Sequence, residues 1–266
     1  MNSDLSYRGR WCVVAGYALA MGWVEAAVVY YLRTMVNRIE PYQPNPLPLM
    51  GGFGRAELVR EAATLVMLLA VGILAGKSWR ARLGFSAMAF GIWDISYYAF
   101  LKVLCGWPHS LFDWDILFLI PLPWWGPVLA PVLISLLMIG WGTLASLESP
   151  QRSGRPAELL VWVLNLSGVV LSLWIFMQDT LAVRNQGLDA IREVLPQRFH
   201  WSSFCIALIF MSAPVFLALR RLLPDVNRRA DAPDLDNAAQ PSTSTVRLPT
   251  VSPSTRNLGA PSRLSG

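Results

Sequence analysis

The sequence predicts an all-α integral membrane protein with about six transmembrane helices. Two properties of the composition point this way. Of the 266 residues, 54% are hydrophobic and only 15% are charged, whereas a soluble domain carries about 25% charged residues. The chain also has twelve tryptophans and seven tyrosines, whose amphipathic rings favour the boundary between membrane and water. Both properties are typical of a chain whose main solvent is lipid.

Six stretches are long and apolar enough to cross a bilayer, which takes roughly 20 residues of helix. They cover residues 11–32, 56–76, 83–105, 126–147, 159–178 and 201–219. The chain is thus expected to comprise an N-terminal segment (1–10), a transmembrane helical domain (11–223) and a C-terminal tail (224–266). The tail is rich in Ser, Pro, Asn, Asp and Arg. We expect it to be disordered, because it cannot bury enough apolar surface to offset the entropy of ordering.

Residues 114–125, before the fourth span, interrupt the helical pattern. No charged residue occurs from Ile116 to Leu147, yet prolines occupy positions 121, 123, 127 and 131. A straight helix over that stretch would be about 48 Å long, more than the roughly 30 Å core of a bilayer. Because proline breaks helices, we predict a Pro-broken interfacial or re-entrant segment here. Irregular backbone at that depth must be covered by protein or line a wet cavity.

The basic residues indicate the orientation of the helices in the membrane. One side carries Arg8, Arg10, Lys77, Arg80, Arg82, Arg152, Arg155, Arg220, Arg221, Arg228 and Arg229. The other side also carries arginines, but the loop after the third span has none. Since basic residues concentrate on the cytoplasmic side, we predict a bacterial-type plasma (inner) membrane protein with both termini in the cytoplasm. The net charge of +5 then reflects orientation, and no nucleic-acid partner is predicted.

With this topology, the ionisable residues of the spans gather toward the outer side. At 1.5 Å per residue, Glu25 lies about 21 Å and Asp94 about 17 Å from the cytoplasmic ends of their helices. Tyr97 and Tyr98 follow Asp94 by one turn, so a tyrosine hydroxyl is placed to donate to its carboxylate. We predict a polar pocket that opens to the periplasmic side. The candidate ligand-binding or proton-relay residues are Glu25, Asp94, Tyr97, Tyr98, Lys102, Glu57, Arg60, Glu61, His109, Asp113 and Asp115.

Each candidate also has a structural interpretation. Asp94 and Glu25 could tie helices together through hydrogen bonds, and the charges from Glu57 to Glu61 suit the start of a helix. No catalytic residue or cofactor can be assigned, and no metal site is predicted. Three cysteines and two histidines show no metal-ligand spacing. The phosphate-binding, dinucleotide, zinc-protease and serine-hydrolase motifs are absent from the sequence.

Three functions are compatible with this pattern. The first is a protein that binds or transports a small molecule, ion or lipid head group. The second is a non-catalytic subunit or assembly factor of a membrane complex. The third is a membrane-embedded enzyme acting on a lipid-linked substrate, with Asp94 or Glu25 as base and His109 or Lys102 assisting. The expected partners are membrane lipids, together with a small-molecule or lipid ligand or with other subunits of a membrane complex.

Overall fold

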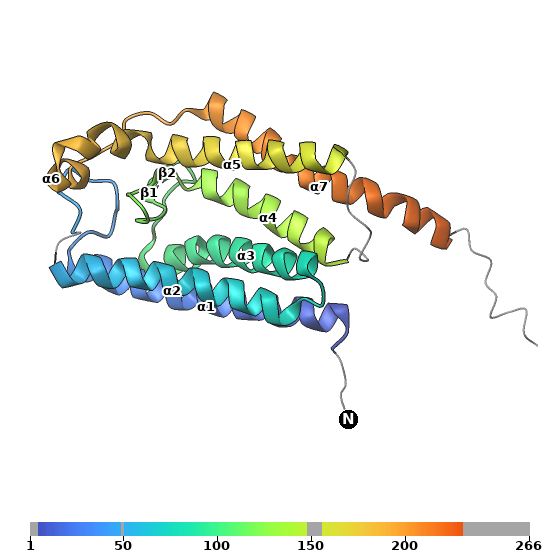
Figure 1. The fold of residues 1–266 in the computed structure, drawn as a ribbon. Coiled ribbons are helices and arrows are strands. Elements are labelled where there is room, and N and C mark those ends of the chain that lie inside the picture. The colour runs from blue at the N-terminus through green and yellow to red at the C-terminus, as the bar shows by residue number, and fades with distance from the viewer. Residues whose placement is uncertain (1–4, 49–50, 148–155, 231–266) are drawn as a thin grey trace, which may run out of the picture. The chain divides into compact units, whose positions relative to one another are not determined.

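The fold is mostly helical (Figure 1). The computed structural model describes residues 5–48, 51–147 and 156–230. Residues 1–226 form one compact unit, and the packing described below is that of this unit. Within the described ranges, six helices are long and apolar enough to cross a membrane. This agrees with a multi-pass membrane protein.

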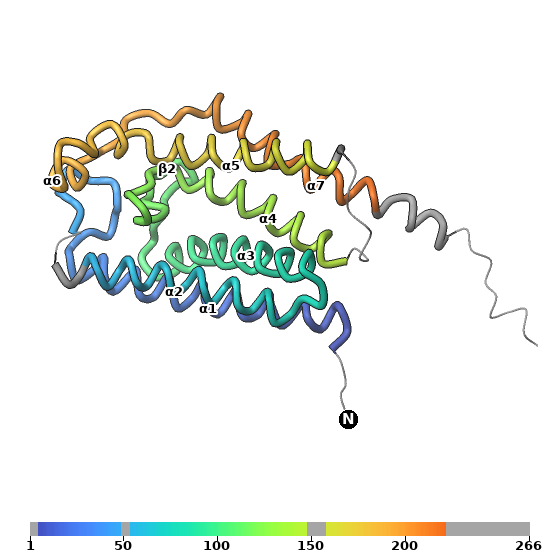
Figure 2. The backbone as a smooth tube through the Cα atoms, in the orientation of Figure 1, coloured from blue at the N-terminus to red at the C-terminus, as the bar shows by residue number. Residues whose placement is uncertain are grey.

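Each of these six helices overlaps one predicted span, and most extend beyond it. Their order along the chain can be followed in Figure 2. Two shorter elements follow the fifth long helix: a 3-10 turn, η1 (Arg184–Gln186), and helix α6 (Leu188–Arg192). The long helices are α1 (Tyr7–Met35), α2 (Gly51–Ala75), α3 (Trp79–Cys105), α4 (Leu129–Leu147), α5 (Pro156–Val183) and α7 (Trp201–Ala230). The last of them continues into the segment predicted as a disordered tail, and residues 231–266 lie outside the described residues.

Local sequence explains where several helices begin and end. The hydroxyl of Ser6 accepts from the backbone N–H of Gly9, and that of Ser78 accepts from Ala81. These serines satisfy backbone donors that a helix start leaves unpaired. Helix α3 ends at Cys105 and is capped by Gly106, whose φ of 77° places it in the left-handed region, where glycine carries no steric penalty.

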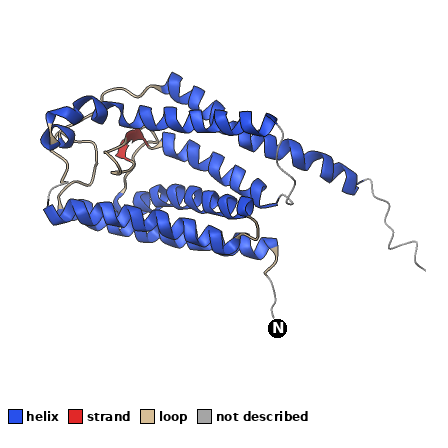
Figure 3. Ribbon diagram, viewed as in Figure 1, coloured by secondary structure: helices blue, strands red, loops and turns tan. Residues whose placement is uncertain are grey.

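The proline-rich segment before α4 is a short antiparallel hairpin, which the prediction of an all-α chain did not include. Strand β1 (Trp114–Ile116) pairs with β2 (Trp125–Pro127), and Asp115 lies opposite Gly126 (Figure 3). Helix α4 therefore starts at Leu129 and not at Gly126 as predicted. The prolines explain why no helix forms, since each removes a backbone donor. Tryptophan and isoleucine in turn favour strands.

Helix α3 is the centre of the packing, with α1, α2 and α4 all against it. Small residues allow the close approach to α4. A Cβ atom at Gly91 would collide with the carbonyl oxygen of Ser135, and Gly84 and Gly142 lie against each other's backbone. Such contacts between small residues are a common way to join helices in a membrane.

The hairpin and the loop after α1 lie at the same end of the helices, where α1 and α3 finish and α2 begins. That loop is anchored to the segment around α6. The backbone N–H of Leu47 donates to Arg192 at 2.9 Å, and the Arg192 side chain donates back to the Leu47 carbonyl at 2.7 Å. Tyr42 donates to the carbonyl of Pro196 at 2.8 Å. These contacts hold the loop after α1 against the segment around α6.

Candidate functional site

A cavity of about 150 Å³ lies at this end, between α1, α2, α3 and the hairpin. Charged side chains from all four elements line it. Five are acidic, namely Glu25, Glu57, Glu61, Asp94 and Asp115, and three are basic, namely Arg33, Arg38 and Arg60. The cavity thus brings together eight of the eleven residues singled out from the sequence, with Tyr97 and Tyr98 among them.

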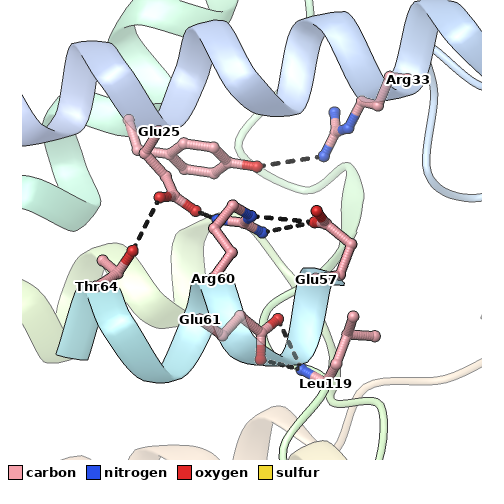
Figure 4. Close-up of polar contacts among 8 residues, drawn as sticks. Glu25, Arg33, Glu57, Arg60, Glu61, Thr64 and Leu119 are labelled. Atoms are coloured by element: carbon pink, nitrogen blue, oxygen red, sulfur yellow. Dashed lines mark hydrogen bonds and ion pairs between the residues drawn. The ribbon is translucent and has the colours of Figure 1, made fainter. Parts of the chain in front are cut away.

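Arg60 is the central cation of the cavity (Figure 4). Its guanidinium holds Glu57, one turn earlier on α2, at 2.8 Å, and it also forms an ion pair with Glu25 on α1. The other Glu25 oxygen accepts from the hydroxyl of Thr64 at 3.3 Å. Since Glu25 is only 8% exposed, these partners offset much of the cost of burying its charge.

Glu61 binds the hairpin, and the charge of the neighbouring Arg60 also acts on its carboxylate. Both of its carboxylate oxygens accept from the backbone N–H of Leu119 at 3.0 Å (Figure 4). Leu119 lies beyond β1 in the hairpin loop, where the chain has no strand partner for this N–H. A side chain of α2 therefore satisfies a backbone N–H of the irregular segment.

Asp94 sits on α3 and is 6% exposed. The hydroxyl of Ser135 on α4 donates to its Oδ2 atom at 2.8 Å. The sequence suggested a tyrosine as this donor, but the hydroxyls of Tyr97 and Tyr98 face the other charges. Tyr97 accepts from Arg33 at 3.4 Å, and Tyr98 lies beside Asp115. The donor to Asp94 thus comes from a different helix.

Arg33 and Asp115 form the second ion pair of the cavity, at 2.8 Å. The Arg33 guanidinium also stacks over the Trp107 ring, 4.3 Å from its centroid, a favourable cation–π contact. Asp115 is 1% exposed. Burial raises the pKa of the Asp115 carboxyl, and the neighbouring Arg33 opposes that rise.

Sequence analysis did not single out Arg33 and Arg38, because both lie at the end of a span and were counted as loop charges. The spacing on α1 contains a signal for Arg33. It follows Glu25 by eight residues, close to the same face of a helix. Nothing in the sequence indicates Arg38, whose guanidinium points back to the carbonyls of Pro41, Gln43, Asn45 and Pro46. Burial is the main cause of its lowered pKa.

Three of the predicted residues lie away from the cavity. Lys102 is exposed and donates to the carbonyl of Gly106 at 2.9 Å, which caps α3. The ring of His109 is exposed and faces Glu40 at 3.2 Å. Asp113 accepts from the backbone N–H groups of His109 and Ser110. These contacts give each residue a local structural role at the surface.

Comparison with protein-family models, curated proteins and solved structures gives no match for this chain. The chemistry is inferred from the cavity itself. Among the residues that the structure describes, no three His, Cys, Asp or Glu side chains are grouped to hold a metal ion. What the cavity offers is paired charge, hydroxyl groups and aromatic walls at one end of a helical unit.

Proposed function

We propose that the chain is a six-span inner-membrane protein that binds or transports a small molecule, ion or lipid head group in this cavity. The observation that carries the proposal is a space of about 150 Å³ walled by five carboxylates and three guanidiniums. Ionisable residues at membrane depth are costly and commonly mark a ligand or ion pathway. Side chains that only tie helices together need no space of that size between them.

The same proposal places the cavity end of the helices on the periplasmic side and both termini in the cytoplasm. Lys77 and Arg82 follow the opposite end of α2, as the bias of basic residues toward the cytoplasm favours. The hairpin would then be the interfacial or re-entrant segment. The hydrogen bonds of the hairpin backbone support this placement. The hydroxyl of Thr180 on α5 donates to the carbonyl of Pro123 at 2.8 Å, and the carboxylate of Glu61 accepts from the N–H of Leu119.

A second candidate is a non-catalytic subunit or assembly factor, in which these charges serve as ties. The ion pair of Arg60 with Glu25 favours it, since this pair links α1 to α2. The enzyme hypothesis required His109 or Lys102 beside Asp94 or Glu25. Neither side chain lines the cavity, so this hypothesis has no assisting group where it needs one.

The test is mass spectrometry of the full chain after gentle solubilisation. Wild type is compared with Asp94→Asn and Glu25→Gln, which change the charge at nearly constant shape. Asp113→Asn is the matched control, because Asp113 is an acidic residue outside the cavity. We expect a lipid or small molecule to remain with wild type and the control and to be lost from the two cavity variants.

The contrary result is equally clear. If nothing remains bound to wild type, and the two cavity variants differ from it only in stability in detergent, the charges are structural ties. Stoichiometric protein partners in the same spectra would then favour the subunit or assembly factor.

A further inference from the structure

Positive charge in the cavity is scarcer than the count of arginines indicates. Arg38 has five N–H groups, and all of them are directed to carbonyl oxygens of residues 41–46. A guanidinium has no further donors, so Arg38 has none left for a carboxylate or a ligand. Only Arg33 and Arg60 remain to face the five carboxylates.

These two guanidiniums already form ion pairs within the protein. Arg60 is shared between Glu25 and Glu57, and Arg33 is paired with Asp115. Among the described residues, Asp94 pairs with no cation and accepts from a neutral donor, the Ser135 hydroxyl. Glu61 accepts from the Leu119 amide and interacts only with the charge of Arg60, which Glu25 and Glu57 already share. Because an unpaired buried carboxylate is costly, the cavity favours a ligand that carries positive charge.

Aromatic rings make the same cavity attractive for an organic cation. Trp93, Tyr97 and Phe118 line it, and the Trp93 ring stands 6.4 Å from each of the other two, centroid to centroid. The faces of aromatic rings attract ammonium groups, and quaternary ammonium ligands are recognised in this way. Trp93 directly precedes Asp94 in the sequence, so the ring and the carboxylate belong to one turn of α3.

The indole N–H of Trp93 adds an independent observation. Trp93 is only 6% exposed, and its Nε1 atom has no hydrogen-bond partner among the described residues. A buried donor of this kind usually bonds to something. Because Trp93 lines the cavity, a hydroxyl or ester oxygen of a ligand bound there would satisfy this N–H.

We propose that the cavity binds a small organic ammonium group with a nearby hydroxyl or ester oxygen, as in an amino alcohol, either free or as a lipid head group. This inference rests on the proposed function and names the ligand class of the same site. The size agrees, because an engineered protein cavity of about 150 Å³ holds one benzene molecule. The space suits a head group of similar size, with Asp94 at the charge and Trp93 at the oxygen.

The test measures thermal unfolding of the purified full chain in detergent against increasing probe concentration. Choline and ethanolamine are the cationic probes. The neutral control is 3,3-dimethylbutan-1-ol, which has the shape of choline without its charge, and the anionic control is glycerol phosphate. We expect a saturable rise in the unfolding temperature with choline or ethanolamine and none with the two controls.

Two variants locate the effect. Asp94→Asn should weaken the binding of the cationic probe by roughly 10- to 100-fold, as expected for the loss of a charge-assisted contact. Lys102→Gln, outside the cavity, should leave it unchanged. If Asp94→Asn does not fold, Trp93→Phe keeps the aromatic face and removes the N–H. The Trp93→Phe variant should then weaken the binding of choline more than the binding of tetramethylammonium, which has no oxygen.

The outcomes separate the two proposals. Equal binding of choline and its neutral analogue, or preference for glycerol phosphate, would overturn the inference of an ammonium ligand. The proposed function, that the cavity binds a ligand, would still hold. Binding of no probe, with no molecule retained from the membrane, would overturn both. A retained lipid with an ammonium head group that free choline displaces would identify a lipid as the source. Choline binding without a retained lipid would identify a free amine.

Discussion

Glu25 on α1 and Arg60 on α2 form an ion pair that joins two helices at the wall of the cavity. Arg60 holds Glu57 as well, so the two residues are not equivalent. Loss of Glu25 leaves Arg60 with one carboxylate partner. Loss of Arg60 leaves two carboxylates without a cation.

This asymmetry predicts that Arg60→Met destabilises the protein more than Glu25→Gln. Breaking a buried ion pair by removing one partner costs about 3–5 kcal/mol, and the arginine variant should approach that range. The double variant should cost less than the sum of the two single variants, because the groups contact each other. Chemical unfolding in detergent measures all three. Equal effects of the two single variants, or strict additivity, would contradict the arrangement of Figure 4.

Glu61 is predicted to hold the hairpin in place. Glu61→Leu removes the acceptor of the Leu119 N–H, whereas Glu61→Gln keeps an acceptor oxygen. Hydrogen exchange at Leu119 should therefore speed up by about tenfold or more in the leucine variant, given about 1.5–3 kcal/mol for a hydrogen bond to a charged group. The glutamine variant should show a smaller change. Glu57→Gln is the control and should leave this amide protected, since the Glu57 side chain bonds to Arg60 and not to Leu119 among the described residues.

The burial of Asp115 predicts how stability depends on pH. Its pKa in the folded protein is raised by burial, while the unfolded chain titrates at about 3.9. A raised folded pKa contributes stability that is fully present below the unfolded pKa and is lost as pH rises through the folded pKa. Asp115→Asn cannot titrate at this position.

The unfolding temperature of wild type relative to Asp115→Asn should therefore fall as pH rises from about 4 upward. Thermal unfolding of both proteins across that range gives the difference directly. A difference that stays constant with pH would show that Asp115 keeps its ordinary pKa. A difference that grows with pH would show that the ion pair with Arg33 outweighs the cost of burial.

The proposed orientation predicts which loops a membrane-impermeant thiol reagent reaches in intact cells. The natural cysteines at 12, 105 and 205 are first replaced by serine. A cysteine at His109, exposed at the cavity end, should be labelled from outside. A cysteine at Lys77, exposed at the opposite end, should be labelled only after the membrane is opened. The reverse pattern would place the cavity on the cytoplasmic side.

The shared location of the cavity residues has a basis in the sequence. Glu25, Asp94 and the charges of α2 interrupt apolar stretches, and the rise per residue places them at similar depth on neighbouring helices. Their common location was therefore predictable without knowing the packing. Lys102 was expected near the outer end of the third span, on one edge of the same face as Asp94. It lies at that end but does not line the cavity, because a long side chain one turn before the helix end reaches the last carbonyls more easily than the interior.

The sequence by itself determined the helical character of the chain, the approximate limits of the six apolar helices and the interruption by prolines before α4. These properties follow from transfer of apolar side chains out of water and from the missing N–H of proline, which act locally. Only the tertiary structure decided that Arg60 serves two carboxylates, that Ser135 bonds Asp94 and that Glu61 holds Leu119. Such pairings depend on the rotation and spacing of the helices. Contacts between small residues such as Gly91 and Ser135 set that spacing, and no single stretch of sequence encodes it.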